Sequence, residues 1–153
     1  KFLRARYRRA QVEVRDTHAL SLNEYIHRYG LDRYFDSDVW QTFDIKVDLT
    51  GFVRAPRQKG VAFVECKTTP ISLRHLSQLL GYSRVAVPLS SHLISPVGIG
   101  GNLRSLILRY DRNDILEYAW TEGLVPRRIV LGMWDPSSGT LDATSLLPLG
   151  VTA

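Results

Sequence analysis

The chain has 153 residues, of which 44% are hydrophobic and 23% charged, the composition of an ordinary globular domain. This length predicts a single domain over residues 1–153 with one core. The single cysteine, Cys66, excludes an internal disulfide framework and a cysteine-based zinc or iron–sulfur site, and it fits a cytoplasmic location. The apolar runs are too short to cross a bilayer, so no membrane partner is expected.

The N-terminal segment is strongly basic. The net charge is +5, and the first nine residues, "KFLRARYRR", carry five positive charges and no acid. We expect residues 1–15 to be helical and this surface to attract a polyanion, the alternative being a solvated helix face. The candidates for contact with nucleic-acid phosphates are Arg4, Arg6, Arg8, Arg9 and Arg74.

A second helix is predicted from the stretch "SLNE" (21–24). Ser21 and Glu24 have the spacing of a capping box, in which each side chain bonds the backbone of the other residue. Gly30 then ends this helix, because glycine readily takes the left-handed conformation of a C-cap.

A β-hairpin follows. Apolar and polar residues alternate between Val39 and Val53, which indicates a strand. Pro and Gly in "APRQKG" (55–60) indicate a turn, and residues 61–68 form the second strand. With the turn centred near residue 57, Asp48 lies opposite Glu65, and Lys67 shares the face of Glu65 one pleat further on.

Two opposed carboxylates destabilise a hairpin unless positive charge lies between them. Asp48, Glu65 and the backbone carbonyl of Cys66 would supply part of the oxygen shell of Mg²⁺, and Lys67 could hold a water or stabilise charge on phosphorus. This is the chemistry of phosphodiester hydrolysis. The alternative for these residues is a surface ion-pair ladder.

The remainder predicts an alternation of helices and strands. Residues 72–88 form a helix with an apolar stripe of leucines from Leu73 onward, 92–97 a strand, 103–120 a long helix, and 127–147 a hairpin. This order predicts an α/β or α+β sandwich. Cys66 is expected in the core, and the three tryptophans in the core or in an interface.

The spacing of "VD" (47–48) and "ECK" (65–67) resembles the PD-(D/E)xK nuclease superfamily, with Val47 where the family name has proline. The similarity covers about residues 15–110. It implies an α/β, restriction endonuclease-like fold, with a central mixed β-sheet flanked by helices. It also implies Mg²⁺ or Mn²⁺ bound by Asp48 and Glu65, with Lys67 as a catalytic residue.

The stretch "QLLGY" (78–82) resembles the Q-x-x-x-Y motif of the RecB-like branch of this superfamily. His75, Gln78 and Tyr82 share one helix face by their spacing. That face could contact the DNA backbone or order the water at the site. A plain amphipathic helix with a polar outer face is the alternative.

Family members often bring one more acid from the N-terminal helix. Glu24 is the better placed candidate for this metal ligand, although its capping box explains it equally well, and Glu13 is the other. The resemblance implies a metal-dependent deoxyribonuclease whose partner is DNA. The alternatives are a silent nuclease-fold module that binds nucleic acid, or an assembly unit of a larger complex. The sequence leaves a homodimer open.

Overall fold

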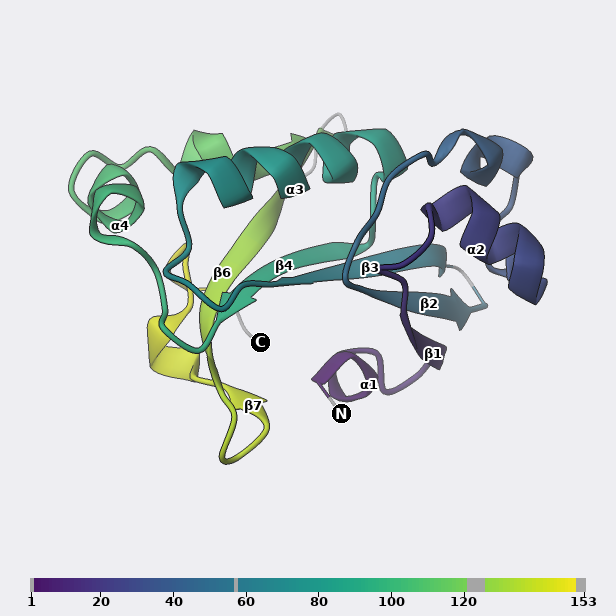
Figure 1. The fold of residues 1–153 in the computed structure, drawn as a ribbon, viewed down its shortest axis with the longest axis horizontal. Helices are drawn as coiled ribbons and strands as arrows, with labels where there is room; N and C mark the ends of the chain where they lie inside the picture. The colour runs from purple at the N-terminus through teal and green to yellow at the C-terminus, as the bar shows by residue number, and fades with distance from the viewer. Residues whose placement is uncertain (1, 57, 121–125, 151–153) are drawn as a thin grey trace.

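The computed structural model describes residues 2–56, 58–120 and 126–150. Its centre is one mixed seven-stranded sheet with the order β1-β2-β3-β4-β6-β5, in which β7 also pairs with β6 (Figure 1). The strands are β1 (Gln11–Asp16), β2 (Leu49–Ala55), β3 (Gln58–Cys66), β4 (Ser90–Ser95), β5 (Glu117–Ala119), β6 (Arg127–Asp135) and β7 (Thr140–Leu141). The α/β class expected from the sequence, with a mixed sheet flanked by helices, is therefore confirmed.

The helices cover the two faces of the sheet unequally (Figure 1). They are α1 (Phe2–Arg6), α2 (Leu22–Tyr29), α3 (Leu73–Ala86) and α4 (Gly101–Leu108), with short 3₁₀ segments at Asp32–Tyr34, Asp38–Thr42, Asn113–Leu116 and Ala143–Ser145. The helices α2, α3 and α4 lie on one face, whereas the short α1 lies alone on the other. Within the described residues, no helix has the length and apolar character needed to span a membrane.

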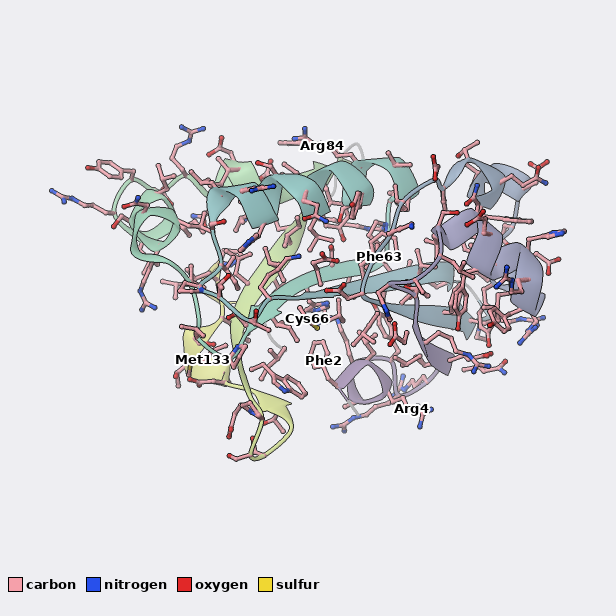
Figure 2. The ribbon with its side chains drawn as sticks, viewed as in Figure 1. Phe2, Arg4, Phe63, Cys66, Arg84 and Met133 are labelled. Carbon is pink, nitrogen blue, oxygen red and sulfur yellow. The ribbon has the colours of Figure 1, made fainter. Side chains whose placement is uncertain are left out.

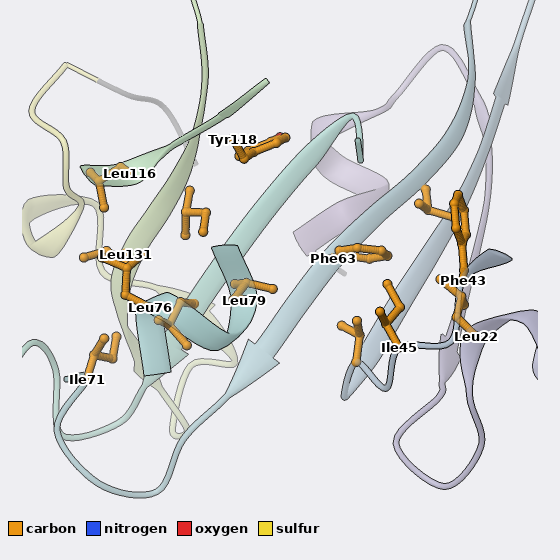
Figure 3. Packing of buried hydrophobic residues seen from close by; sticks show 14 of the residues in the cluster. Leu22, Phe43, Ile45, Phe63, Ile71, Leu76, Leu79, Leu116, Tyr118 and Leu131 are labelled. Atoms are coloured by element: carbon orange, nitrogen blue, oxygen red, sulfur yellow. The ribbon is translucent and has the colours of Figure 1, made fainter. Parts of the chain in front are cut away.

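The larger core lies between the sheet and the helices α2, α3 and α4. Phe63 of β3 and Leu131 of β6 are fully buried there, against Leu22 of α2 and Leu79 of α3 (Figure 3). On the other face, Leu3 of α1 packs in a smaller cluster. Burial of these apolar side chains is what holds the layers together.

The directions of the strands place the C-terminal ends of β3, β4 and β6 next to one another. The strands β2 and β3 form the predicted antiparallel hairpin, while β3, β4 and β6 run parallel. Parallel neighbours need a crossover connection, which α3 provides between β3 and β4. The C-terminal ends of β3, β4 and β6 therefore lie at the same edge of the sheet.

Several predicted elements are confirmed. The helix α2 begins after Ser21 with its capping box to Glu24, and it ends at Gly30, whose φ of 60° is left-handed. The helix α3 and the hairpin formed by β6 and β7 occupy the predicted stretches. Each of these elements is indicated by residues close together in the sequence: helix caps, turn residues, or the spacing of apolar side chains.

The prediction of a helix over residues 1–15 is wrong after Arg6. Residues 11–16 form β1, an edge strand that pairs with β2, with Val12 opposite Val53. Val12 and Val14 alternate with polar and charged residues, which is the pattern of a strand. The strand that pairs with it, β2, is distant in sequence. The predicted strand from Val39 also begins late: residues 38–42 form a 3₁₀ segment, and β2 starts at Leu49.

The predicted helix over residues 103–120 ends at Leu108. Asp111 has a φ of 50°, a left-handed conformation that interrupts the helix. The chain then forms β5, where Tyr118 is buried beside β6. The apolar residues after Asp111 therefore contribute to the core from a strand.

Two side chains predicted to be buried are not: Cys66 is exposed at the end of β3, and Leu73 is 45% exposed in the first turn of α3. Trp120, expected in the core or in an interface, is 75% exposed and so lies outside the core. Cys66 does lie on the opposite sheet face from Glu65, as expected, but α1 is too short to cover that face at Cys66.

Candidate functional site

The register of the hairpin places Asp48 opposite Glu65. Leu49 pairs with Val64, so the next residues along the two chains are Asp48 and Glu65, as the turn position predicted. Their side chains reach across the hairpin in both directions. The backbone N–H of Cys66 donates to Asp48 Oδ2 at 2.8 Å, and the backbone N–H of Asp48 donates to Glu65 Oε2 at 3.3 Å. These crossed hydrogen bonds hold both carboxylates at the same strand ends.

Lys67 completes the cluster at the end of β3. Its Nζ donates to Glu65 Oε1 at 2.7 Å, and its backbone N–H donates to the carbonyl of Ile94 at 2.8 Å. The Glu65 side chain is 3% exposed and that of Lys67 19%. An ion pair this well buried is not the solvated surface ladder considered from the sequence.

Burial makes the negative charge of Glu65 less favourable. Desolvation raises the pKa of Glu65, and the neighbouring Asp48 carboxylate raises it further, whereas the hydrogen bond from Lys67 opposes both effects. Two carboxylates face one ammonium, which leaves one negative charge without a matching side chain within the cluster. A bound cation would relieve this repulsion and favour the ionised form of Glu65.

The donor set suits a hard divalent cation. Asp48 and Glu65 supply carboxylate oxygens, and the predicted third donor is the carbonyl of Cys66. Among the described residues, no group of three or more His, Cys, Asp or Glu side chains is arranged to hold a metal. A magnesium ion here would therefore depend on water and on substrate oxygens for the rest of its shell, as Mg²⁺ commonly does.

The first turn of α3 lies close to the cluster. The positive charge of Lys67 contributes to the lowered pKa of His75, after desolvation as the larger cause, and Arg74 adds to it. His75 and Ser72 form a capping box, with the backbone N–H of Ser72 donating to His75 Nδ1 at 3.3 Å. Gln78 and Tyr82 are joined to each other, since Gln78 Nε2 donates to the Tyr82 hydroxyl at 3.1 Å.

The two candidate acids from the N-terminal region have other partners. Glu24 accepts hydrogen bonds from the hydroxyl of Ser21 at 2.7 Å and from its backbone N–H at 3.3 Å, which favours the capping interpretation. Glu13 lies on β1 and bonds Arg33 and the Tyr34 hydroxyl. The structure thus joins Asp48, Glu65 and Lys67 but gives neither glutamate a hydrogen bond to them.

Sequence reasoning missed the segment after β1. Thr17 is buried, its backbone N–H donates to the carbonyl of Asp48 at 2.9 Å, and its hydroxyl donates to the carbonyl of Val47 at 2.6 Å. The adjacent His18 bonds Asp16, which raises the pKa of His18, and the Asp48 carboxylate adds to that shift. The available signal was the alternation of Val12 and Val14 with polar residues, which predicts a strand. That strand pairs with β2, so the residues that follow it lie next to Asp48.

The predicted arginines do not gather in one place. Arg74 lies beside His75 near the cluster. Arg6, Arg8 and Arg9 instead line a cavity with Gln58 and Leu89, toward the other end of β3. Arg4 is exposed on α1 (Figure 2).

An apolar cavity of about 450 Å³ borders the cluster on the α1 side of the sheet. Phe2, Cys66, Lys67 and Trp134 are among its lining residues, and Figure 2 shows Phe2 and Cys66 on this side. Desolvation, with the charges of Asp48 and Glu65 adding to it, raises the pKa of Cys66 to about 11. The Cys66 thiol is therefore protonated at neutral pH and is a poor nucleophile.

Comparisons of this chain with protein-family models, with curated proteins and with solved structures gave no match. The interpretation of the site therefore depends on its own geometry and on the sequence motifs.

Proposed function

We propose that this chain is a metal-dependent nuclease that hydrolyses DNA phosphodiester bonds, with a restriction endonuclease-like fold of the PD-(D/E)xK type. The observation that carries this proposal is the cluster around the buried Glu65. The backbone N–H of Asp48 donates to Glu65, the backbone N–H of Cys66 donates to Asp48, and Lys67 pairs with Glu65. The order of elements around it, a hairpin followed by α3 and the parallel strand β4, supports the same assignment.

Each residue of the cluster has a defined task in this proposal. Asp48 and Glu65 would hold Mg²⁺ or Mn²⁺, and the ion would supply a Lewis acid for the scissile phosphate and lower the pKa of an attacking water. Lys67 favours the ionised form of Glu65 through the 2.7 Å contact, against the rise in pKa caused by burial. An ammonium has three N–H donors, so Lys67 can also donate to a phosphoryl oxygen or orient the water.

The residues of α3 would act on the substrate from one side. Arg74 is exposed and cationic, so it can bind a phosphate next to the scissile one. Gln78 and Tyr82 present an amide and a phenol that already orient each other, which fits a role in holding the DNA backbone or a water.

The test is cleavage of labelled single-stranded, duplex and branched DNA with Mg²⁺ or Mn²⁺. Asp48→Asn and Lys67→Met should each lower the cleavage rate at least about 100-fold, because the charge at the reacting phosphate is lost. Both variants should bind DNA in Ca²⁺ nearly as the wild type does. Asp44→Asn, on an exposed residue of the same segment, is the matched control and should cut normally.

One observation favours a second function, a nuclease-fold module that binds DNA without cutting it. The described residues offer two carboxylates and no third acidic or histidine ligand at the cluster. Wild-type protein that binds every DNA form but cuts none with either metal would establish this alternative.

A further inference from the structure

Two adjoining cavities lie away from the Asp48–Glu65 cluster, where β3 and β4 begin. The first, of about 760 Å³, is lined by residues 5–10 together with Ala55, Gln58 and Leu89. The second, of about 400 Å³, lies beside the start of β6. Arg6 and Leu89 line both cavities, so the two form one continuous groove. We call it the arginine groove, after Arg6, Arg8, Arg9, Arg127 and Arg128.

The arginine groove is positively charged. Its described lining has five arginines and no aspartate or glutamate. The charge of Arg128 is balanced by Glu117 at 2.7 Å. Arg127 donates to the carbonyl of Pro88 at 3.0 Å, a neutral group that does not balance its positive charge. Arg8 likewise donates to a neutral carbonyl, that of Ala5, at 3.2 Å. An anion in the groove would therefore meet several cations and no carboxylate on its walls.

Hydrogen bonds and packing hold the walls of the groove in place. The Tyr7 hydroxyl donates to Ser90 Oγ at 2.8 Å, which fastens the segment after α1 to the start of β4. Leu3 of α1 is buried against the sheet, and the Tyr118 hydroxyl donates to the Pro88 carbonyl at 3.1 Å. The backbone that carries the arginines is thus ordered before a ligand arrives, which lowers the entropy cost of binding.

The strand β3 runs from the groove to the cluster, so its length gives the separation between them. Gln58 lines the groove, the carbonyl of Val61 accepts from the backbone N–H of Leu89 at 2.7 Å, and Cys66 bonds Asp48. At about 3.3 Å per residue, the groove and Cys66 are roughly 16–26 Å apart along the strand. That separation corresponds to about five to eight base pairs of duplex DNA.

We infer that the arginine groove binds the sugar-phosphate backbone of the same nucleic acid whose scissile phosphate lies at Asp48 and Glu65. Binding by the groove rests on its own charge, while the span to the cluster rests on the proposed nuclease function. The groove contacts phosphates five to eight base pairs from the cut, so tight binding requires a substrate of at least that length. It adds affinity without reading sequence.

The test compares two charge reversals of equal size. Arg8→Glu with Arg9→Glu alters the groove, whereas Arg104→Glu with Arg109→Glu alters exposed arginines of the α4 region that line neither cavity of the groove. Arg8→Gln with Arg9→Gln is a milder second variant, and thermal melts establish that all three are folded. Fluorescence anisotropy in Ca²⁺, which can neutralise the two carboxylates of the cluster, measures binding of labelled 5- and 20-base-pair duplexes, each closed by a hairpin loop, between 50 and 300 mM salt.

For the 20-base-pair duplex, the log–log salt slope of the groove variant should become shallower by about 1.8, roughly 0.9 for each phosphate that is no longer neutralised. Binding of the 5-base-pair duplex should change little, and the control should match the wild type on both. An unchanged slope in the groove variants would overturn the inference, and an equal loss of affinity on both duplexes would overturn the span. Failure of the nuclease proposal is a separate result, seen as absent cleavage by wild-type protein whose slope still responds to the groove variant.

Discussion

Replacing His92 should remove an acid sensitivity that the fold itself creates. His92 is fully buried on β4, its Nδ1 lies 3.3 Å from the Phe63 carbonyl, and its Nε2 has no hydrogen-bond partner among the described residues. The Phe2 ring packs edge-on against it at 4.8 Å between centroids. Desolvation, with the charge of Arg6 adding to it, lowers the pKa of His92 to about 3.

The sign of the effect follows from the two states. The unfolded histidine takes up a proton near pH 6.5, whereas the folded one stays neutral until about pH 3. Acid therefore favours the unfolded state, and the stability from neutral His92 is present above pH 6.5 and is lost as the pH falls toward 3. At about 1.4 kcal/mol per pH unit, lowering the pH from 7.5 to 5.0 should cost about 2 kcal/mol through this residue.

Urea unfolding of wild-type protein and His92→Leu at pH 7.5 and 5.0 measures this difference. The wild type should lose about 2 kcal/mol more than the variant between the two pH values, equivalent to roughly 4–8 °C in melting temperature. His27→Gln, which alters an exposed histidine on α2, should lose about as much as the wild type. Equal losses in wild-type protein and His92→Leu would refute the assignment of a neutral, desolvated histidine.

Three further predictions test the cluster and the fold. The raised pKa of Glu65 means that its contribution to stability falls as the pH increases through that pKa. In urea unfolding without metal, the stability of Glu65→Gln relative to the wild type should therefore be higher at pH 8 than at pH 4, and an equal difference at the two pH values would contradict this. Cys66 should react with maleimide at pH 7 about 100-fold more slowly than an ordinary thiol, measured by mass spectrometry, since its pKa is about 11, and a normal rate would contradict that shift. Gly100→Ala should cost about 1–3 kcal/mol in urea unfolding, because its added Cβ would lie 2.9 Å from the Ile71 carbonyl oxygen, whereas the control Gly101→Ala meets no atom within 4 Å and should not destabilise; similar losses in the two variants would contradict the clash.

The hairpin and its carboxylate pair could be predicted because their signals are local. A period of two assigns faces to residues, and the turn near residue 57 sets the register, so Asp48 and Glu65 follow from counting. The capping box at Ser21 and the left-handed Gly30 likewise depend on residues within a few positions of each other. The sequence by itself therefore determined the centre of the candidate site.

Burial at the site was decided by the tertiary structure. The sequence "ECK" is compatible both with a solvated ion-pair ladder and with a desolvated ion pair. Glu65 is buried because β4 and the helical layer enclose the end of β3, and those contacts come from residues distant in sequence. The pKa shift of Glu65 follows from that enclosure.

The tertiary structure also decided what the basic N-terminal segment does. The charge of "KFLRARYRR" is plain in the sequence, and it suggested one basic helix over residues 1–15 that attracts a polyanion. The chain instead forms the short α1, which runs across the sheet from Phe2 near Cys66 to Arg6 near Leu89, and then β1, whose partner β2 lies more than thirty residues later. Pairing and packing between segments so far apart leave no short-range pattern, so charge could be counted from the sequence while its position could not.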